Sequence, residues 1–400
     1  MYSLLLAVIY AAFISLGLPD SLLGSSWPVM QQEFGVPVSF AGIVFMIIAV
    51  GTVAASLLSD RLTRRFGAGK VTAVSVLMTG IALLGFSLTE VFPLLCLWAI
   101  PYGLGAGAVD AALNNYVALH YTSRHMSWLH CFWGIGASVG PYIISACLSG
   151  GWGWKGGYRI ISVLQLILTI LLFLSLPLWK QAAGAEAAGA ESPAPEKALG
   201  LLQVLRIPGV PLILTAFFCS CSMSQTCILW ASSYLVRQRQ VDETTAASFA
   251  SLFLAGVTFG RFLSGFISEK LGDQRMIRMG ILTVIGGLSL VALPIEFDGL
   301  ALAGLVVAGL GCAPIYPSII HSAPGNFGKE ASQAVIGVQM AAAYIGTALS
   351  PPLFGVIASR IHIGLFPFFA LFFAFMVLLM TELLNRTVAK RKAAGLKDLP

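Results

Sequence analysis

The sequence has very few charged residues. Only 10% of its 400 residues are charged and 58% are hydrophobic, whereas soluble domains carry about 25% charged residues. This composition excludes a soluble globular protein and indicates an integral membrane protein. The net charge of +6 does not indicate nucleic-acid binding, because most basic residues lie in short connections between apolar segments, where they set membrane topology.

Motifs of enzymes and metalloproteins are also missing. The sequence has no phosphate-binding glycine loop, no zinc-ligand spacing and no nucleophile elbow. Its seven cysteines all lie in apolar segments, without metal-ligand spacing to histidines, so we predict buried thiols rather than a metal site or a disulfide framework. We therefore expect no enzyme activity, no cofactor, no metal and no nucleic-acid partner.

Apolar segments long enough to cross a bilayer fill most of the chain. A membrane span needs about 20 mostly apolar residues. The first such run begins almost at Met1 without a basic segment or a cleavage site, which favours a membrane helix over a signal peptide. The sequence predicts twelve spans, at approximately 4–30, 38–58, 71–89, 93–119, 127–149, 158–179, 208–235, 244–267, 276–294, 299–321, 332–358 and 362–384.

A segment rich in Ala, Gly, Pro and Glu separates the first six spans from the last six, and it predicts a flexible linker. We expect an N-terminal six-helix bundle over 1–180, a cytoplasmic linker over 181–206, a C-terminal bundle over 207–386 and a cytoplasmic tail over 387–400. The basic residues are concentrated in the loops on one side. They place both termini in the cytoplasm of a bacterial inner membrane.

The two halves of the sequence repeat one another. The matched segments are SLLSDRLTRR and GFISEKLGD after the second and eighth spans, GLGAG and GLGCA in the fourth and tenth, and GASVGP and GTALSP in the fifth and eleventh. Parallel six-helix repeats with a substrate site near the midplane are typical of one transporter architecture.

These features resemble the major facilitator superfamily. The segment from Ser56 to Arg65 is similar to its loop signature, with Ser and Thr where the family prefers Gly, and the segment from Gly265 to Gly272 is the second copy. The resemblance implies an all-α fold of twelve transmembrane helices in two pseudo-symmetric bundles that works by alternating access. The acids and bases of such loops can pair at helix ends and latch the halves in one state. The expected gating-loop residues are Asp60, Arg61, Arg64, Arg65, Glu269 and Lys270.

The fourth span also resembles the fucose:proton symporter family, which includes bacterial glucose/mannose symporters. The resemblance rests on the pattern Gly-Ala-Val-Asp110-Ala-Ala-Leu-Asn114, with Asp where the family usually has Glu. That family also carries an aspartate late in the first helix, which corresponds to Asp20 here. In the family the two acids are linked to proton and sugar binding.

Elimination leads to the same two aspartates without any family. The other acids fall in loops, in the linker or at span ends, whereas Asp20 and Asp110 lie at membrane depth, where a carboxylate is costly and usually functional. We predict that one or both bind and release protons. The alternative for Asp20 is a helix-capping role after Pro19. Gly103, Gly105 and Gly107 would allow a neighbouring helix to approach closely.

Polar and aromatic residues at depth are candidates for binding the solute. Asn114 and Asn115 are favoured because they lie beside Asp110; for the others, packing or interfacial anchoring is an equally good interpretation. His130 has proton relay as a further alternative. For Arg261 we favour a structural role. The remaining candidates are Trp27, Tyr102, His130, Trp133, Gln225, Trp230, Tyr316 and Gln339.

The sequence thus predicts a monomeric, proton-coupled symporter of a small polar solute, with a sugar as the favoured substrate class and with protons and membrane lipids as its other partners. A proton-antiport exporter of drugs or metabolites is the alternative, because Gly136-xxx-Gly140-Pro141 resembles part of an antiporter motif. A membrane receptor or lipid-handling protein is a third, less favoured possibility.

Overall fold

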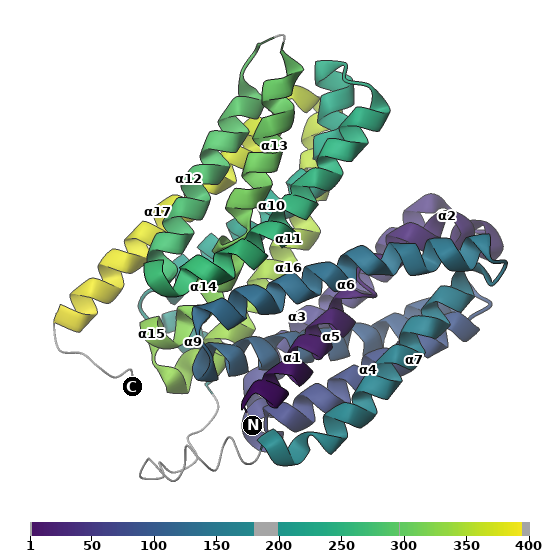
Figure 1. Cartoon of the computed structure of the whole chain (residues 1–400), viewed down its shortest axis with the longest axis horizontal. Coiled ribbons are helices and arrows are strands. Elements are labelled where there is room, and N and C mark those ends of the chain that lie inside the picture. Colours follow the sequence, from purple (N-terminus) through teal and green to yellow (C-terminus); the bar gives the residue numbers. More distant parts are fainter. Residues whose placement is uncertain (1, 180–198, 296, 394–400) are drawn as a thin grey trace. The chain divides into compact units, whose positions relative to one another are not determined.

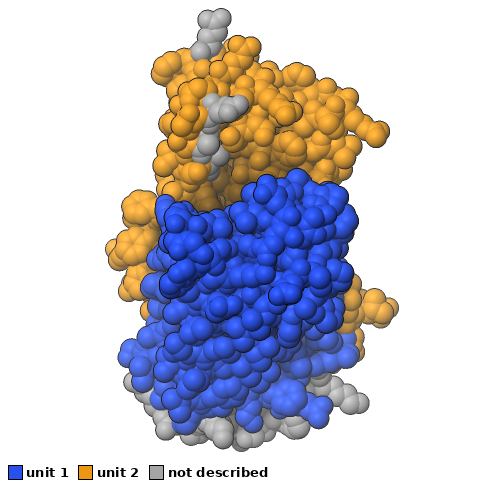
Figure 2. Space-filling model, turned by 90° about the vertical axis from the view of Figure 1, so that its right-hand side faces the viewer, with its two compact units in different colours: residues 1–116, 132–200 blue, residues 117–131, 201–400 orange. Residues whose placement is uncertain are grey.

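A computed structural model describes residues 2–179, 199–295 and 297–393. Within these ranges the chain is all-α, and twelve helical segments are long and apolar enough to cross a membrane, which confirms the predicted fold class. The helices form two compact units (Figure 2), one of Met1–Tyr116 with Phe132–Gly200 and the other of Val117–Cys131 with Leu201–Pro400. We call them unit 1 and unit 2.

Unit 1 is built from the helices of the first sequence repeat. Its first span is discontinuous, because a turn at 18–21 separates α1 from α2. Helices α5 and α6 are shared between the two units, because their residues 117–131 belong to unit 2. The helices are α1 (Tyr2–Gly17), α2 (Leu22–Phe34), α3 (Ala41–Phe66), α4 (Ala68–Leu88), α5 (Phe92–His120), α6 (Ser123–Ser149) and α7 (Gly153–Leu174), with the 3-10 turn η1 (Val38–Phe40).

Unit 2 contains the second repeat, and its tenth span is also interrupted, at Ala313 and Pro314. Helix α12 lies alongside α13 and α17, and α10 lies alongside α16 (Figure 1). The elements are α9 (Leu201–Arg206), α10 (Val210–Arg239), α11 (Glu243–Leu271), α12 (Asp273–Ala292), α13 (Asp298–Cys312), α14 (Ile315–His321), α15 (Ala323–Phe327), α16 (Lys329–Arg360), η2 (Ile363–Leu365) and α17 (Phe366–Ala393).

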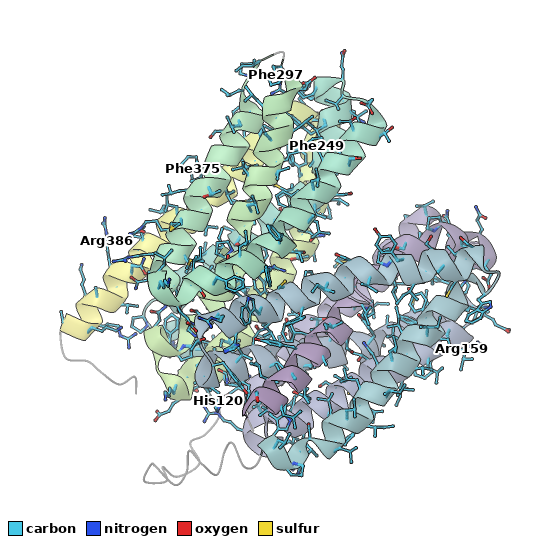
Figure 3. The ribbon with its side chains drawn as sticks, in the orientation of Figure 1. His120, Arg159, Phe249, Phe297, Phe375 and Arg386 are labelled. Carbon is cyan, nitrogen blue, oxygen red and sulfur yellow. The ribbon has the colours of Figure 1, made fainter. Side chains whose placement is uncertain are left out.

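Large apolar side chains remain exposed on many helices, as a lipid environment requires. On α17, Phe372 and Phe375, the latter labelled in Figure 3, are 58% and 54% exposed, and Phe259 on α11 is 57% exposed. Buried positions include aromatic residues such as Trp154 and Tyr158 of unit 1. The greasy surface and the packed interior together fit helices that are solvated by hydrocarbon.

Glycines bring the helices of each repeat into close contact, as the sequence predicts. A Cβ on Gly105 of α5 would lie 2.7 Å from the carbonyl oxygen of Ser75 on α4, and one on Gly311 of α13 would lie 2.8 Å from that of Gly280 on α12. Gly103 and Gly107 pack likewise against the backbone of α3. The internal sequence repeat is therefore also a repeat of helix-to-helix contacts.

The boundaries differ from prediction at three places. The expected gating-loop residues lie in the final turns of α3 and α11, which end only at Phe66 and Leu271, and not in loops. Of the expected linker, 181–198 lies outside the described residues and Leu201–Arg206 is helical. Helix α17 runs to Ala393, so the part of the expected tail at 387–393 is helical.

Candidate functional site

Asp20 lies in the turn between the two halves of the first span. The turn begins where α1 ends at Gly17, next to Pro19, and α2 starts at Leu22. The Asp20 carboxylate is exposed and accepts a hydrogen bond from Nε1 of Trp133, at 2.8 Å. Discontinuous membrane helices commonly form substrate and ion sites in transporters, because their broken backbone can face a cavity.

Close packing between α1 and α6 brings Trp133 to this turn. Gly136 and Gly140 on α6 abut the carbonyl groups of Ile14 and Leu18 so closely that neither position has room for a Cβ. The hydroxyl of Ser21 also donates to the carbonyl of Ala137, at 2.8 Å. The Gly136-xxx-Gly140 motif, which resembles an antiporter motif, thus serves this helix contact.

Asp110 and Asn114 form a second polar pair, on α5. Asp110 is only 5% exposed, and the Asn114 amide donates to its carboxylate at 2.8 Å and to its backbone carbonyl at 3.0 Å. Asn115 is buried beside them. The Asp110 carboxyl and the hydroxyl of Tyr102 both lie close enough to Asp20 to interact with it electrostatically. The structure therefore brings the two predicted aspartates into one polar region of unit 1.

Two other candidates, His130 and Tyr316, meet in unit 2. Their rings form an edge-to-face pair with centroids 4.7 Å apart, and His130 is 4% exposed, two turns inside α6. Arg261 of α11 donates from Nη1 to the His130 carbonyl at 3.2 Å, and its Cζ lies 6.0 Å from the centre of the Tyr316 ring. Sequence reasoning treated these three residues separately.

The indole groups of two further candidates are engaged in packing. Nε1 of Trp27 donates to the carbonyl of Val38 at 2.8 Å, and Nε1 of Trp230 donates to the carbonyl of Pro351 at 3.0 Å. Gln225 is partly buried on α10. Gln339 on α16 is 0% exposed, and neither atom of its amide has a hydrogen-bond partner in the described structure.

The expected gating residues make two different sets of contacts. Asp60 is buried and pairs with Arg64 at 2.8 Å one turn along α3, while Arg61, Arg65 and Lys270 are exposed. Glu269 pairs with residues at the junction of α5 and α6.

That second contact uses residues that the sequence motifs did not identify. Within unit 2, Glu269 binds Nη2 of Arg124 and the hydroxyl of Thr122, both at 2.6 Å. His321 lies 2.8 Å from Asp273 and 3.2 Å from the Tyr121 carbonyl. The only sequence signal for Arg124 was its place in a short basic connection, which indicates topology rather than pairing. Among the described residues, no group of three His, Cys, Asp or Glu side chains could hold a metal ion.

Comparison with known proteins identifies relatives along the whole chain. The sequence model of the Major Facilitator Superfamily matches residues 9–351 and 234–398. The chain is 24% identical over 392 residues to the uncharacterized transporter y4wD of Sinorhizobium fredii, covering 94% of this chain and 97% of the relative. It is 23% identical over 320 residues to the glucose/mannose transporter GlcP of Bacillus subtilis, covering 77% of each. It is 27% identical over 344 residues to the 3-(3-hydroxy-phenyl)propionate transporter of Escherichia coli, covering 82% of this chain and 79% of the relative.

A solved structure shows the same fold. The E. coli fucose:proton symporter FucP superposes with a TM-score of 0.75 at 15% identity, covering 96% of this chain and 99% of that one. The twelve helices, the internal repeat and the family match therefore all indicate the fold of the major facilitator superfamily.

Proposed function

Because this chain belongs to the major facilitator superfamily, we propose that it is a proton-coupled secondary active transporter that moves a small polar solute by alternating access. The observation that carries the proposal is the position of Asp20, a carboxylate in the break of the first span, held by the indole of Trp133. A carboxylate at membrane depth normally marks an ion or substrate path.

The second aspartate supports the coupling. Asp110 interacts electrostatically with Asp20, so a proton on one carboxyl changes the free energy of charging the other. Trp133 donates to Asp20, and a solute hydroxyl can replace either partner of that hydrogen bond. Protonation of Asp20 and binding of the solute would in this way both change the hydrogen bond between Trp133 Nε1 and the Asp20 carboxylate, which links the two events.

The groups of unit 1 taken alone support a hydroxyl-rich solute, that is, a sugar or a sugar derivative, since carboxylate, indole and amide groups suit hydroxyls. GlcP and FucP carry sugars according to their names. We further propose that the chain works as a monomer in a bacterial inner membrane with both termini in the cytoplasm. An antiport exporter is less well supported, because the glycines that resemble the antiporter motif are used in packing against α1.

The test is uptake into proteoliposomes with and without an inward proton gradient, using a panel of neutral sugars and organic acids. We compare the wild type with Asp20→Asn, which keeps an acceptor for Trp133, and with Asp110→Asn. Glu90→Gln is the matched control, because this exposed acid lies in the connection between α4 and α5. We expect gradient-driven accumulation to be lost in Asp20→Asn while counterflow persists.

Two outcomes would contradict the proposal. Gradient-driven uptake that survives both aspartate substitutions would remove the coupling role of these acids. Absence of uptake for the whole panel, together with extrusion of a fluorescent dye that depends on Asp20 or Asp110, would identify an exporter.

A further inference from the structure

Unit 2 carries a buried cation well inside a membrane span. Arg261 lies ten residues before the end of α11, about 15 Å along the helix at 1.5 Å per residue, in a hydrocarbon layer about 30 Å thick. It is only 8% exposed. Arginine at such depth is rare and usually faces the interior of a bundle, where it acts on a substrate or an ion.

Arg261 contacts groups from two helices, and two further helices pack on one of these groups. His130 of α6 accepts its hydrogen bond through the backbone carbonyl, and Tyr316 of α14 presents its ring to the guanidinium. Tyr316 also packs on Phe217 of α10, with ring centroids 4.6 Å apart, and its hydroxyl lies 3.5 Å from the sulfur of Met340 on α16. The Tyr316 ring, held in place by Phe217 and Met340, therefore provides an apolar wall beside the N–H donors of the guanidinium.

Most of the described acids of unit 2 lie near helix ends. Glu269 is two turns from Arg261 on the same helix and pairs with Arg124, and Asp273 begins α12 and pairs with His321. Glu382 lies within α17 but is partly exposed and pairs with Arg278 near the start of α12. The remaining described acids lie in the first turn, or at the N-cap, of α11, α13 and α16. In the described part of unit 2, Arg261 is thus a buried cation with the acids named here placed elsewhere.

The internal repeat shows where this positive charge arises. In GLGAGAVD the seventh residue after the first glycine is Asp110, whereas in GLGCAPIY it is Tyr316. Gly51 packs against Gly103 as Gly256 packs against Gly309, so Arg261 takes the place of Ser56 in the second repeat. Ser56 donates to the carbonyl of Gly107 at 3.4 Å and so serves helix packing. Equivalent positions are therefore acidic or structural in unit 1 and cationic and aromatic in unit 2.

Unit 2 also holds a buried amide, on the helix that carries Met340. Gln339 immediately precedes Met340, the residue in contact with Tyr316, and both polar atoms of its side chain are buried without a hydrogen-bond partner. A buried amide in this state carries a free-energy cost that a ligand able to hydrogen-bond with it would remove.

We propose that Arg261, with Tyr316 and His130, binds the carboxylate of the transported solute, so that the substrate class is an organic acid, such as a sugar acid or an aromatic acid, and not a neutral sugar. This rests on the proposed transport function and specifies its substrate. A planar guanidinium matches a carboxylate with two parallel N–H···O bonds, and the phenol ring provides a face for the body of the solute. The aspartates of unit 1 then handle the proton.

The experiment measures binding directly, so that it does not depend on proton coupling. Purified protein in detergent is titrated with gluconate, glucuronate and 4-hydroxybenzoate, and with glucose and methyl 4-hydroxybenzoate as neutral counterparts, while the apparent unfolding temperature is followed. We expect at least one carboxylate to raise this temperature in a saturable way, because a ligand that binds the folded state stabilises it. Its neutral counterpart should have no effect.

Variants then locate the site. Arg261→Gln should weaken carboxylate binding by about tenfold or more, as loss of a charged hydrogen bond implies, with Arg261→Lys intermediate. Arg237→Gln is the matched control, since Arg237 is exposed near the end of α10. If Arg261→Gln does not fold, Tyr316→Phe and Arg261→Lys carry the test.

The outcomes separate the two proposals. Equal affinity of wild type and Arg261→Gln for a transported acid, or saturable binding of glucose but of no acid, would overturn the carboxylate site while leaving proton-coupled transport intact. Binding of an acid that depends on Arg261, without transport of any solute in proteoliposomes, would support the site and overturn the transport function.

Discussion

The contact between α5 and α4 offers a quantitative test of how the helices are packed. A Cβ on Gly105 would lie 2.7 Å from the Ser75 carbonyl oxygen, whereas ordinary contact begins at 3.4 Å, so the helices would have to separate by about 0.7 Å. Two further atoms crowd the same position: Cγ2 of Thr79 at 2.9 Å and Cβ of Met78 at 3.3 Å. The closest atom belongs to the backbone and cannot rotate away.

We therefore expect Gly105→Ala to destabilise the protein by about 1–3 kcal/mol, the usual cost of overpacking. The matched control is Gly42→Ala on α3, where an added Cβ meets nothing within 4 Å. In the control the lower backbone entropy of alanine should be neutral or stabilise by up to about 1 kcal/mol. Thermal unfolding in detergent, followed by tryptophan fluorescence, measures both variants.

The second repeat provides an independent copy of this test. A Cβ on Gly311 would lie 2.7 Å from the Val284 nitrogen and 2.8 Å from the Gly280 carbonyl oxygen, whereas Gly286 on α12 has open space. Gly311→Ala should therefore lower the unfolding temperature and Gly286→Ala should not. Transport should fall in Gly105→Ala as well, because Asp110 lies on the same helix. Equal unfolding temperatures for Gly105→Ala and Gly42→Ala would refute the packing that we describe.

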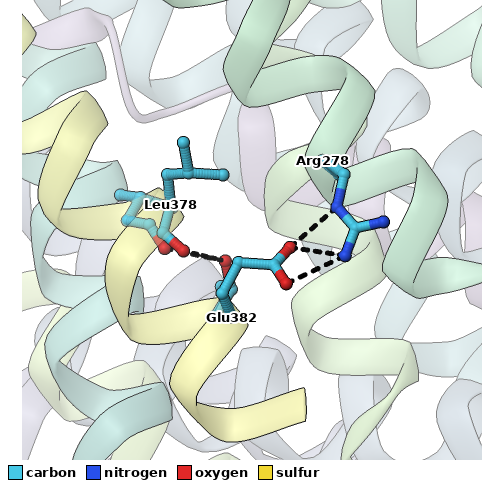
Figure 4. A network of polar contacts seen from close by, with 5 residues as sticks. Arg278, Leu378 and Glu382 are labelled. Carbon is cyan, nitrogen blue, oxygen red and sulfur yellow. Dashed lines mark hydrogen bonds and ion pairs between the residues drawn. The ribbon is translucent and has the colours of Figure 1, made fainter. Parts of the chain in front are cut away.

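Three further predictions concern polar contacts. Glu269→Gln should change the rate of transport more than it changes stability. Its pair with Arg124 is partly exposed, and such pairs contribute about 0–1 kcal/mol to stability. The charge-swapped double variant, Glu269→Arg combined with Arg124→Glu, should restore the rate, and failure to restore it would contradict the pairing. Arg278→Gln removes the two hydrogen bonds that Arg278 donates to Glu382 (Figure 4). It should lower the unfolding temperature only slightly, and by less at high salt. A large decrease in unfolding temperature that does not depend on salt would refute this. Trp230→Phe should cost about 1 kcal/mol of stability by removing the donor to Pro351 while leaving the KM for solute unchanged; a raised KM would restore Trp230 as a binding residue.

The sequence predicted the spans, and singled out two aspartates as site candidates, for simple physical reasons. Hydrocarbon admits long apolar helices and excludes most charges, so composition alone located the helices and left Asp20 and Asp110 as the acids at depth. Helix ends were less predictable, because α3 and α11 continue past their apolar windows. They stop at Gly67 and Gly272, whose φ values of 80° and 74° suit glycine. Those glycines, rather than the loss of hydrophobicity, were the better boundary signal.

Partners from distant segments could not be predicted from sequence. That Trp27 and Trp230 each donate to a backbone carbonyl depends on where η1 and the proline pair of α16 fall in the fold. Resemblance to the superfamily, which often has an arginine at this place, favoured a structural role for Arg261. Nothing in its neighbourhood along the chain shows that His130 and Tyr316 meet there. Contacts of this kind depend on helix rotation as well as helix identity, and periodicity leaves rotation undetermined when a helix is apolar on nearly every face.

The two repeats share a packing scheme but differ in charge, and that difference bears on how coupling works. Both place glycines against equivalent neighbouring helices. The first span, however, is broken at Asp20, whereas α10, its counterpart in unit 2, is continuous. Conversely, the tenth span is broken before Tyr316, whereas its counterpart α5 is continuous. In the described part of the chain, each unit thus has a broken span, beside carboxylates in unit 1 and beside a guanidinium in unit 2. Under our proposals, a proton binds in unit 1 and an anion binds in unit 2, so that they neutralise opposite charges without competing for one side chain. An uncompensated charge is costly to carry through the membrane. Binding of both the proton and the anion would therefore favour the conformational change that carries them across, which is the thermodynamic requirement for symport.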